Sequence, residues 1–227
     1  MNTTSNLRKL ALAFLFAATV GVSSSPRAQT APKSKPAPTV VGSVVQPPLA
    51  VKPVADKLAP AGWTRYEIGE PSRFSLILPA APTEAMNKLD VSAGVNLTVR
   101  NYMVGTETGV YGATYIVGFP AAANNWTEAN KRTFFEGFAK GFVKGFQDGM
   151  SKQGATEELK VVAQRTATAS GLAGHEQDFA FGAILGRVRM VFAGQSAYAL
   201  AAFWNEQTSE SDRKAFFDSL RVNNTRR

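Results

Sequence analysis

The sequence predicts an α+β fold in which an antiparallel β-sheet is flanked by helices, with one long central helix and a short C-terminal helix. Roughly eight segments alternate apolar and polar residues with the period of a β-strand. A long helical pattern separates the first four segments from the last four, and a short amphipathic stretch follows the last strand. The segments are joined by turns rich in Gly, Pro, Asn and Asp, so we expect neighbouring strands to pair antiparallel.

The first 28 residues have the features of a cleaved secretory signal peptide. Arg8 and Lys9 precede an uncharged apolar run of thirteen residues, Leu10 to Val22, which small residues follow as far as Ala28. A membrane-spanning helix needs about 20 apolar residues, so we expect no stable membrane insertion. The chain has no cysteine, which excludes a lipoprotein anchor and disulfides. These features favour a bacterial protein that is periplasmic or secreted.

Residues 29–61 form a segment rich in Ala, Pro, Val and Lys that contains no aromatic residue. Proline at this density disrupts helices and sheet ladders, so we interpret the segment as a flexible linker. The single globular domain is expected at residues 62–223, and a basic tail at 224–227 follows it.

The positive charge of the chain lies mainly outside the predicted domain. The formal net charge is +8, yet residues 62–227 carry 18 basic and 16 acidic residues. A nucleic-acid-binding domain would show basic residues clustered within it, so we expect no nucleic-acid partner.

The predicted strands and helices follow in order along the domain. Strands are expected at residues 64–69, 73–79, 95–104 and 110–119, and after the long helix at 158–168, 174–181, 187–193 and 196–204. A capping box of Asn125 and Glu128 would open the long helix, which runs to about Ser151. Ser209 and Asp212 can cap the last helix, whose apolar side is formed by Ala215, Phe216, Phe217 and Leu220.

Glycine recurs at every fourth position of the long helix, although each glycine costs roughly 1 kcal/mol relative to alanine there. At 100° per residue the phenylalanines share one broad face with Ala139 and Met150, and charged residues occupy the opposite face. The glycines lie on the border between the two faces and would form a shallow groove. We expect this groove to pack against a neighbouring loop or to contact a partner or a second copy of the chain, unless the glycines have no role. Its residues are Gly137, Gly141, Gly145 and Gly149.

The sequence holds no recognisable catalytic or metal-binding motif. His175 is the only histidine, and GQSAY around Ser196 lacks the second glycine of a nucleophile elbow. A histidine that alternates with Gln177 and Phe179 on a strand is most simply structural. One imidazole without any thiolate is a poor basis for a zinc site. We therefore expect no catalytic residue, no metal and no cofactor.

Two pairs of opposite charge fall on neighbouring predicted strands. Glu176 and Asp178 share one strand face, as do Arg187 and Arg189 on the next strand, and the expected pairing brings Asp178 near Arg189. The four residues are either an anion- or carbohydrate-binding patch or a structural ladder of cross-strand ion pairs.

Several short motifs between Gly62 and Asn223 resemble the PsbP-like group, which is named for the extrinsic lumenal subunit of photosystem II. They are the opening W-x-x-Y with RFSLILPAAP, the long central helix, the GLAGHE segment at Gly171 to Glu176, the strand SAYALAAFW and the closing FFDSLRV. The resemblance implies an α/β/α sandwich around an antiparallel sheet, used for binding or assembly rather than for catalysis.

Two hypotheses about function follow from the sequence. In the first, the chain is an exported, non-catalytic binding or assembly module of the cell envelope, and its partner is an envelope protein, a small ligand or a second copy in a weak homodimer. In the second, it binds an envelope-derived small molecule or hydrolyses it through His175.

Overall fold

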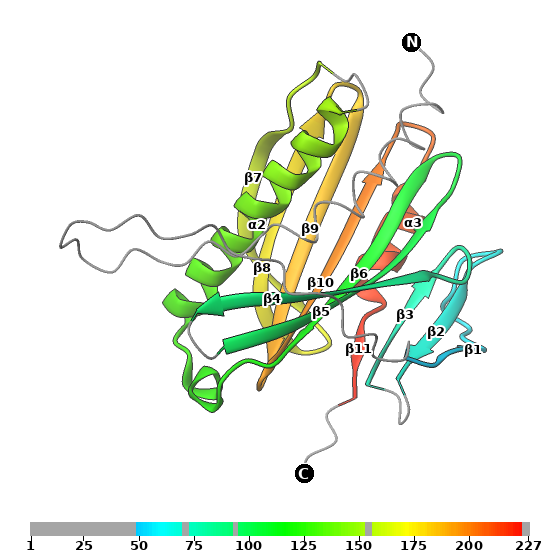
Figure 1. Ribbon diagram of the computed structural model, residues 1–227. Coiled ribbons are helices and arrows are strands. Elements are labelled where there is room, and N and C mark those ends of the chain that lie inside the picture. The colour runs from blue at the N-terminus through cyan, green and yellow to red at the C-terminus, as the bar shows by residue number, and fades with distance from the viewer. Residues whose placement is uncertain (1–48, 70–72, 93–94, 153–155, 224–227) are drawn as a thin grey trace.

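The computed structural model describes residues 49–69, 73–92, 95–152 and 156–223, with the side chains of 87–92, 95, 96 and 149 left undescribed. The predicted signal peptide at 1–28, the first part of the linker at 29–48 and the basic tail at 224–227 lie outside the described residues. Two antiparallel sheets and two α-helices make up the described fold, as Figure 1 shows.

The larger sheet, sheet B, has seven strands in the order β4-β5-β6-β10-β9-β8-β7. Its strands are β4 (Thr83–Ser92), β5 (Val95–Gly105), β6 (Gly109–Val117), β7 (Lys160–Ala169), β8 (Leu172–Phe181), β9 (Ile184–Ala193) and β10 (Ser196–Trp204). The smaller sheet, sheet A, has four strands in the order β1-β2-β3-β11. Its strands are β1 (Val51–Val54), β2 (Thr64–Ile68), β3 (Phe74–Leu78) and β11 (Arg221–Val222).

The helices lie on opposite sides of sheet B. A short 3-10 helix, η1 (Ala121–Asn125), precedes the long helix α2 (Glu128–Ser151), and α3 (Glu210–Asp218) follows the last strand of sheet B. In Figure 1, α2 lies along the β8 and β9 end of sheet B, whereas α3 and sheet A lie on the other side of the molecule.

Two apolar layers result, one on each face of sheet B. On the α2 face, the aromatic side chains of the helix pack on those of the sheet, for example Phe146 on Phe203 at 4.9 Å between ring centroids. On the other face, sheet A and α3 cover aromatic side chains of sheet B, for example Tyr111 against Phe216 at 5.3 Å. Alternation along each strand sends successive side chains to the two layers.

The predicted fold class is confirmed, since the structure is α+β with antiparallel sheets, one long helix and one short C-terminal helix. The strands divide between two sheets, however, because the first two predicted strands pair with each other and with β1 and β11 instead of joining sheet B.

The end of the predicted linker belongs to the folded domain, which corrects the predicted boundary at residue 61. Residues Val51–Val54 pair with β2, and the Leu49 amide donates to Glu84 at 2.9 Å. Asp56 accepts from Arg65 of β2 at 2.5 Å. Proline is tolerated in β1 because this strand lies at the edge of sheet A, where one side needs no ladder hydrogen bonds.

The long helix begins slightly later than the predicted capping box implies. Asn125 ends η1, and Thr127 is the N-cap, with its side chain accepting from the amide of Asn130, which completes the capping box. The helix ends at Ser151, as predicted. For α3, the predicted cap is confirmed, since the Ser209 hydroxyl accepts from the Asp212 amide at 3.1 Å.

Candidate anion-binding site

The four charged residues singled out in the sequence lie on one face of sheet B, at its β7–β9 end. In the register of the β8–β9 hairpin, Glu176 is opposite Arg189 and Asp178 is opposite Arg187. Their side chains are joined by short ion pairs, at 2.6 Å for Arg189 Nε to Glu176 Oε2 and 2.6 Å for Arg187 Nε to Asp178 Oδ1.

The prediction that Asp178 lies near Arg189 was wrong, because Asp178 pairs with Arg187. The turn of this hairpin is shorter than the predicted GAILG segment. Phe181 pairs with Ile184, which leaves a two-residue turn that begins with Gly182 at a φ of 55°. Glycine adopts this left-handed conformation without steric cost, so a tight turn forms and fixes the register.

A third arginine, which the sequence reasoning missed, completes this cluster from β7. Arg165 donates to Glu176 at 2.5 Å and to Asp178 at 2.8 Å. Ser170 and Gly171 form the β7–β8 turn, both with positive φ, and this tight turn places Arg165 opposite Glu176. The turn and strand lengths visible in the sequence could have located it.

The two carboxylates of the cluster differ in environment. Glu176 is 3% exposed and contacts three guanidinium groups, so it is chiefly a structural counter-ion. Burial alone would raise the pKa of Asp178, but hydrogen bonds from Arg187 and Arg165 outweigh it and hold that pKa below its ordinary value. Asp178 is thus ionised at neutral pH and orients Arg187.

Helix α3 approaches the same face of sheet B and binds the cluster through its C-terminal end. Arg189 Nη1 donates to the carbonyl oxygen of Phe217 at 3.1 Å and contacts Asp218 Oδ1 at 3.4 Å. The guanidinium carbons of Arg187 and Arg189 lie 5.6 and 5.3 Å from the centroid of the Phe217 ring. Arg189 therefore anchors α3 to sheet B.

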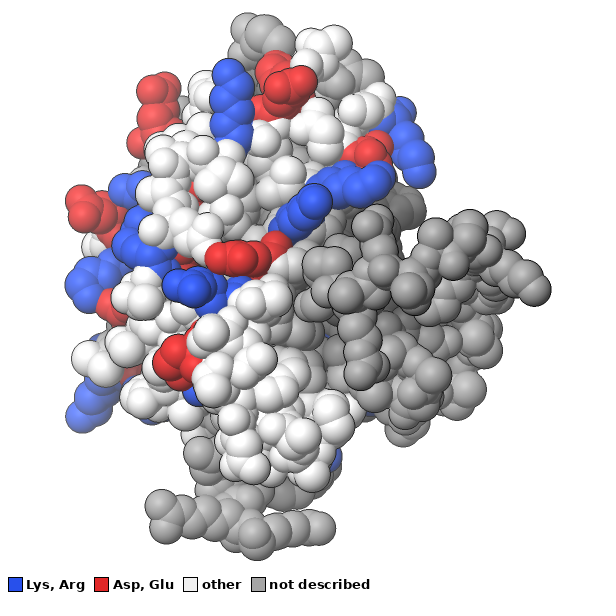
Figure 2. All heavy atoms as spheres, turned by 90° about the vertical axis from the view of Figure 1, so that its left-hand side faces the viewer, with Lys and Arg blue, Asp and Glu red and all other residues white. Residues whose placement is uncertain are grey.

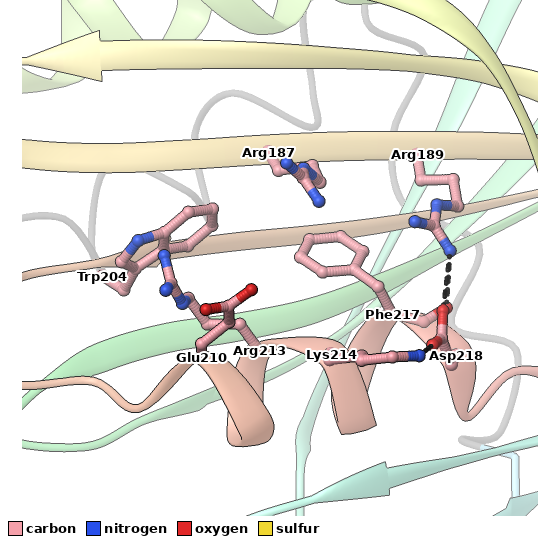
Figure 3. A pocket seen from close by; sticks show the side chains of 8 residues that line it. All are labelled: Arg187, Arg189, Trp204, Glu210, Arg213, Lys214, Phe217 and Asp218. Carbon is pink, nitrogen blue, oxygen red and sulfur yellow. Dashed lines mark hydrogen bonds and ion pairs between the residues drawn. The ribbon is translucent and has the colours of Figure 1, made fainter.

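A pocket of about 340 Å³ opens between α3 and strands β9 and β10. We call it the α3 pocket. Four basic, two acidic and two aromatic side chains line it: Arg187, Arg189, Arg213, Lys214, Glu210, Asp218, Trp204 and Phe217. Figure 3 shows Arg187 and Arg189 pointing from β9 toward α3, with the Phe217 ring rising from the helix toward them.

The arrangement of these side chains favours recognition of an anion over stacking of a sugar ring. Trp204 and Phe217 are only 6% and 2% exposed. Arg213 covers the Trp204 ring at 5.1 Å, just as Arg187 and Arg189 cover Phe217. A ligand would therefore meet guanidinium groups backed by aromatic rings, which suit carboxylate or phosphate oxygens.

Not every cation of the α3 pocket is equally available to a ligand. Arg189 uses its donors on Glu176, Phe217 and Asp218, and Lys214 forms an ion pair with Asp218. Nη1 of Arg187 takes part in no hydrogen bond within the described part of the chain, and Arg213 donates only weakly, to Ser209 at 3.4 Å. Arg187 and Arg213 therefore have the most capacity to bind an anion.

His175 lies on the opposite face of sheet B, away from the α3 pocket. It is buried and its ring stacks on Phe135 of α2 at 5.5 Å between centroids. Burial lowers the pKa of this imidazole, and its Nε2 has no hydrogen-bond partner among the described residues. His175 cannot reach a ligand in the α3 pocket.

The glycines of α2 also belong to the opposite face, so the two groups of predicted site residues do not form one site. Gly145 is buried, Gly137 and Gly141 are partly buried, and the surroundings of Gly149 lie outside the description. The proposed groove stays a prediction. Figure 2 shows the side of the molecule where α2 and β7 lie, with acidic and basic residues interspersed.

Sequence reasoning missed the contribution of α3 to the site. Glu210, Arg213 and Lys214 recur at helical spacing beside the apolar face to which Phe217 belongs, and this spacing is a signal that the sequence contains. The angle at which α3 docks, which turns these residues toward β9, is not encoded in the local sequence.

Two further properties concern only the described residues. Across residues 49–69, 73–92, 95–152 and 156–223, no group of three or more His, Cys, Asp or Glu side chains is placed to hold a metal ion. Within the same ranges, no helix has the length and apolar character needed to span a membrane.

Comparisons with known proteins return matches among solved structures only. No protein-family model and no curated protein matches the chain. The chain is similar to the solution structure of cyanobacterial PsbP (CyanoP) from Synechocystis sp. PCC 6803, with 11% identity and a TM-score of 0.45 over 74% of this chain and 97% of that chain. It is also similar to PA94 from Pseudomonas aeruginosa, a protein of unknown function, with 8% identity and a TM-score of 0.24 over 69% of this chain and 83% of that chain. The first similarity agrees with the resemblance to the PsbP-like group, and it concerns the fold alone.

Proposed function

We propose that this chain is an exported, non-catalytic binding module of the cell envelope that holds an anionic ligand in the α3 pocket. The observation that carries the proposal is the convergence of three arginines and one lysine from β9 and α3 on a single hollow. Among the described residues, two carboxylates line the same hollow, and Glu176 and Asp178 pair with the two arginines of β9 from beside it. The positive charge that remains for a ligand is therefore contributed mainly by Arg213 and by the unused donor of Arg187.

The arginines of the α3 pocket are held in place before any ligand arrives. Asp178 fixes Arg187 by two hydrogen bonds, at 2.6 and 3.3 Å, and Arg213 lies on the Trp204 ring. Fixed guanidinium groups lose less side-chain entropy than loosely held lysines when an anion binds. This smaller loss favours tighter binding.

The proposal of a binding module, as opposed to an enzyme, rests on the side chains that surround the α3 pocket. Among the described residues, this lining includes no histidine, serine or threonine. His175, on which the alternative hydrolase depends, is buried on the other face of sheet B against α2.

The proposal is tested by calorimetric titration of the full chain with phenyl phosphate at low ionic strength, beside the uncharged phenyl glucoside. We expect saturable binding of phenyl phosphate that weakens as salt is added, and no binding of the glucoside. Arg213→Gln should weaken binding about tenfold or more, because it removes one charged contact.

The matched control is Arg132→Gln, which removes an exposed arginine on α2, on the other face of sheet B. It should leave the affinity unchanged. Equal losses in both variants would show that the attraction comes from the overall charge of the protein and would contradict a defined site.

A further inference from the structure

The α3 pocket already contains a carboxylate that contacts two of its four cations. Asp218, the last residue of α3, contacts Arg189 Nη1 at 3.4 Å and forms an ion pair with Lys214. Figure 3 shows both contacts, with Asp218 between β9 and Lys214. Its side chain is 47% exposed, so a ligand can approach it from solvent.

The position of Asp218 in α3 does not explain why an acidic residue occurs there. The carbonyl end of a helix carries partial negative charge, so an acidic residue there is unfavourable and a basic one is preferred. The last turn of α3 contains no basic residue. Lys214 precedes Asp218 by four residues, which is the weaker orientation of such a pair.

The two acidic residues of the α3 pocket differ in what they do. Glu210 lies in the first turn of α3, where a negative charge stabilises the helix, and it forms no ion pair within the described part of the chain. Asp218 instead forms ion pairs with two of the four basic residues that line the pocket, Arg189 and Lys214. Its pKa, which burial alone would raise, is held below its ordinary value by Lys214 and Arg189.

We propose that Asp218 is an internal competitor in the α3 pocket, which a ligand must displace from Arg189 and Lys214, and that it makes the pocket select dianionic groups such as a phosphate monoester over monoanionic carboxylates. The inference rests on the function proposed above. A monoanion that replaces Asp218 exchanges one single charge for another and gains little. A dianion brings an additional charge to the cations of β9 and α3.

The test compares the affinities of phenyl phosphate and benzoate, which share a ring and differ in charge above pH 7. Both are titrated into the full chain, Asp218→Asn and Glu210→Gln, at pH 8 and low ionic strength. The two variants remove the same charge from the lining of the α3 pocket, but only Asp218→Asn frees Arg189 and Lys214.

We expect the full chain to bind phenyl phosphate at least tenfold more tightly than benzoate. In Asp218→Asn, benzoate should bind about five- to tenfold more tightly, and its disadvantage relative to phenyl phosphate should shrink. In Glu210→Gln, both affinities should rise by a similar small factor, so that their ratio is kept. An unchanged melting midpoint verifies that each variant is folded.

Equal gains in Asp218→Asn and Glu210→Gln would overturn the competitor role, because they would reflect general charge alone. A ratio of affinities that Asp218→Asn leaves unchanged would overturn it as well. If neither probe binds the full chain or Asp218→Asn, the proposed function itself fails, and this outcome is distinct from the other two.

Discussion

The ion pair between Asp56 and Arg65 ties the N-terminal strand of sheet A to the rest of the fold, and its loss should destabilise the domain measurably. The Asp56 carboxylate is 7% exposed and accepts from Arg65 Nε at 2.5 Å, from Arg221 Nη2 at 3.3 Å and from the Leu58 amide at 2.9 Å. The Asp56→Ala change would leave the buried Arg65 guanidinium without its counter-ion.

The expected loss of stability depends on the hydrogen bonds that Arg65 retains in Asp56→Ala. Breaking a fully buried ion pair costs about 3–5 kcal/mol. Arg65 retains hydrogen bonds from Nη1 to Ser75 Oγ at 3.0 Å and to the Ser219 carbonyl at 2.8 Å. We therefore expect a loss of about 2–3 kcal/mol in the free energy of unfolding. For a domain of this size, that loss lowers the melting midpoint by roughly 4–12 °C.

Calorimetric or circular-dichroism melting of Asp56→Ala against the full chain measures this loss. Arg221→Ala serves as the control, since it removes the second arginine from the same carboxylate but is 54% exposed, and an exposed pair contributes at most about 1 kcal/mol. If Asp56→Ala melts like the control, the segment that contains β1 and Asp56 does not stabilise the folded domain, and our account of sheet A is wrong.

Three further predictions test other parts of the fold. A chain that begins at Gly62 lacks β1 and Asp56 and should melt at least as far below the full chain as Asp56→Ala does; an equal midpoint would restore the linker boundary predicted from the sequence. Burial lowers the pKa of His175, so the imidazole is protonated at a higher pH in the unfolded chain than in the folded chain. The free energy of unfolding therefore decreases as the pH falls below about 6.5. His175→Phe should therefore lose less of its melting midpoint between pH 7.5 and 5.5 than the full chain; identical losses would show that another group is responsible. Gly145 is buried in α2, so Gly145→Ala should reduce the free energy of unfolding by roughly 1–3 kcal/mol through steric overlap and lower the midpoint; a higher midpoint would mean that this glycine has no packing role.

The fold was largely predictable because strand alternation and helical periodicity survive in the sequence wherever one face is buried. The segment around Tyr198 and Phe203 alternates between the two apolar layers of sheet B, so its strand was expected. By contrast, β1 has only partly buried ends and contains Pro53, so composition alone pointed to a linker. It is held by pairing with β2 and by contacts of its flanking residues, Leu49 with Glu84 and Asp56 with Arg65, none of which shows in a local pattern.

The candidate site was predictable only in part. Faces were assigned correctly, since Glu176, Asp178, Arg187 and Arg189 share one face of sheet B. Their pairing depended on the register set by one turn, because the shorter turn pairs Asp178 with Arg187, two residues before the expected Arg189. The half of the α3 pocket supplied by α3 depends on how the helix docks, which no local pattern determines.

The most direct test of the central claim, that the α3 pocket binds an anion, is a ¹H–¹⁵N spectrum of the labelled full chain titrated with phenyl phosphate. We predict saturable shifts for the Arg187 and Arg213 side-chain Nε–H signals and for the Trp204 indole, which line the α3 pocket. Signals of Gly141 and Gly145 on α2 should stay unchanged, because α2 lies on the opposite face of sheet B. Saturable shifts confined to the α2 glycines, or no saturable shift at all, would contradict the assignment of the binding site to the α3 pocket.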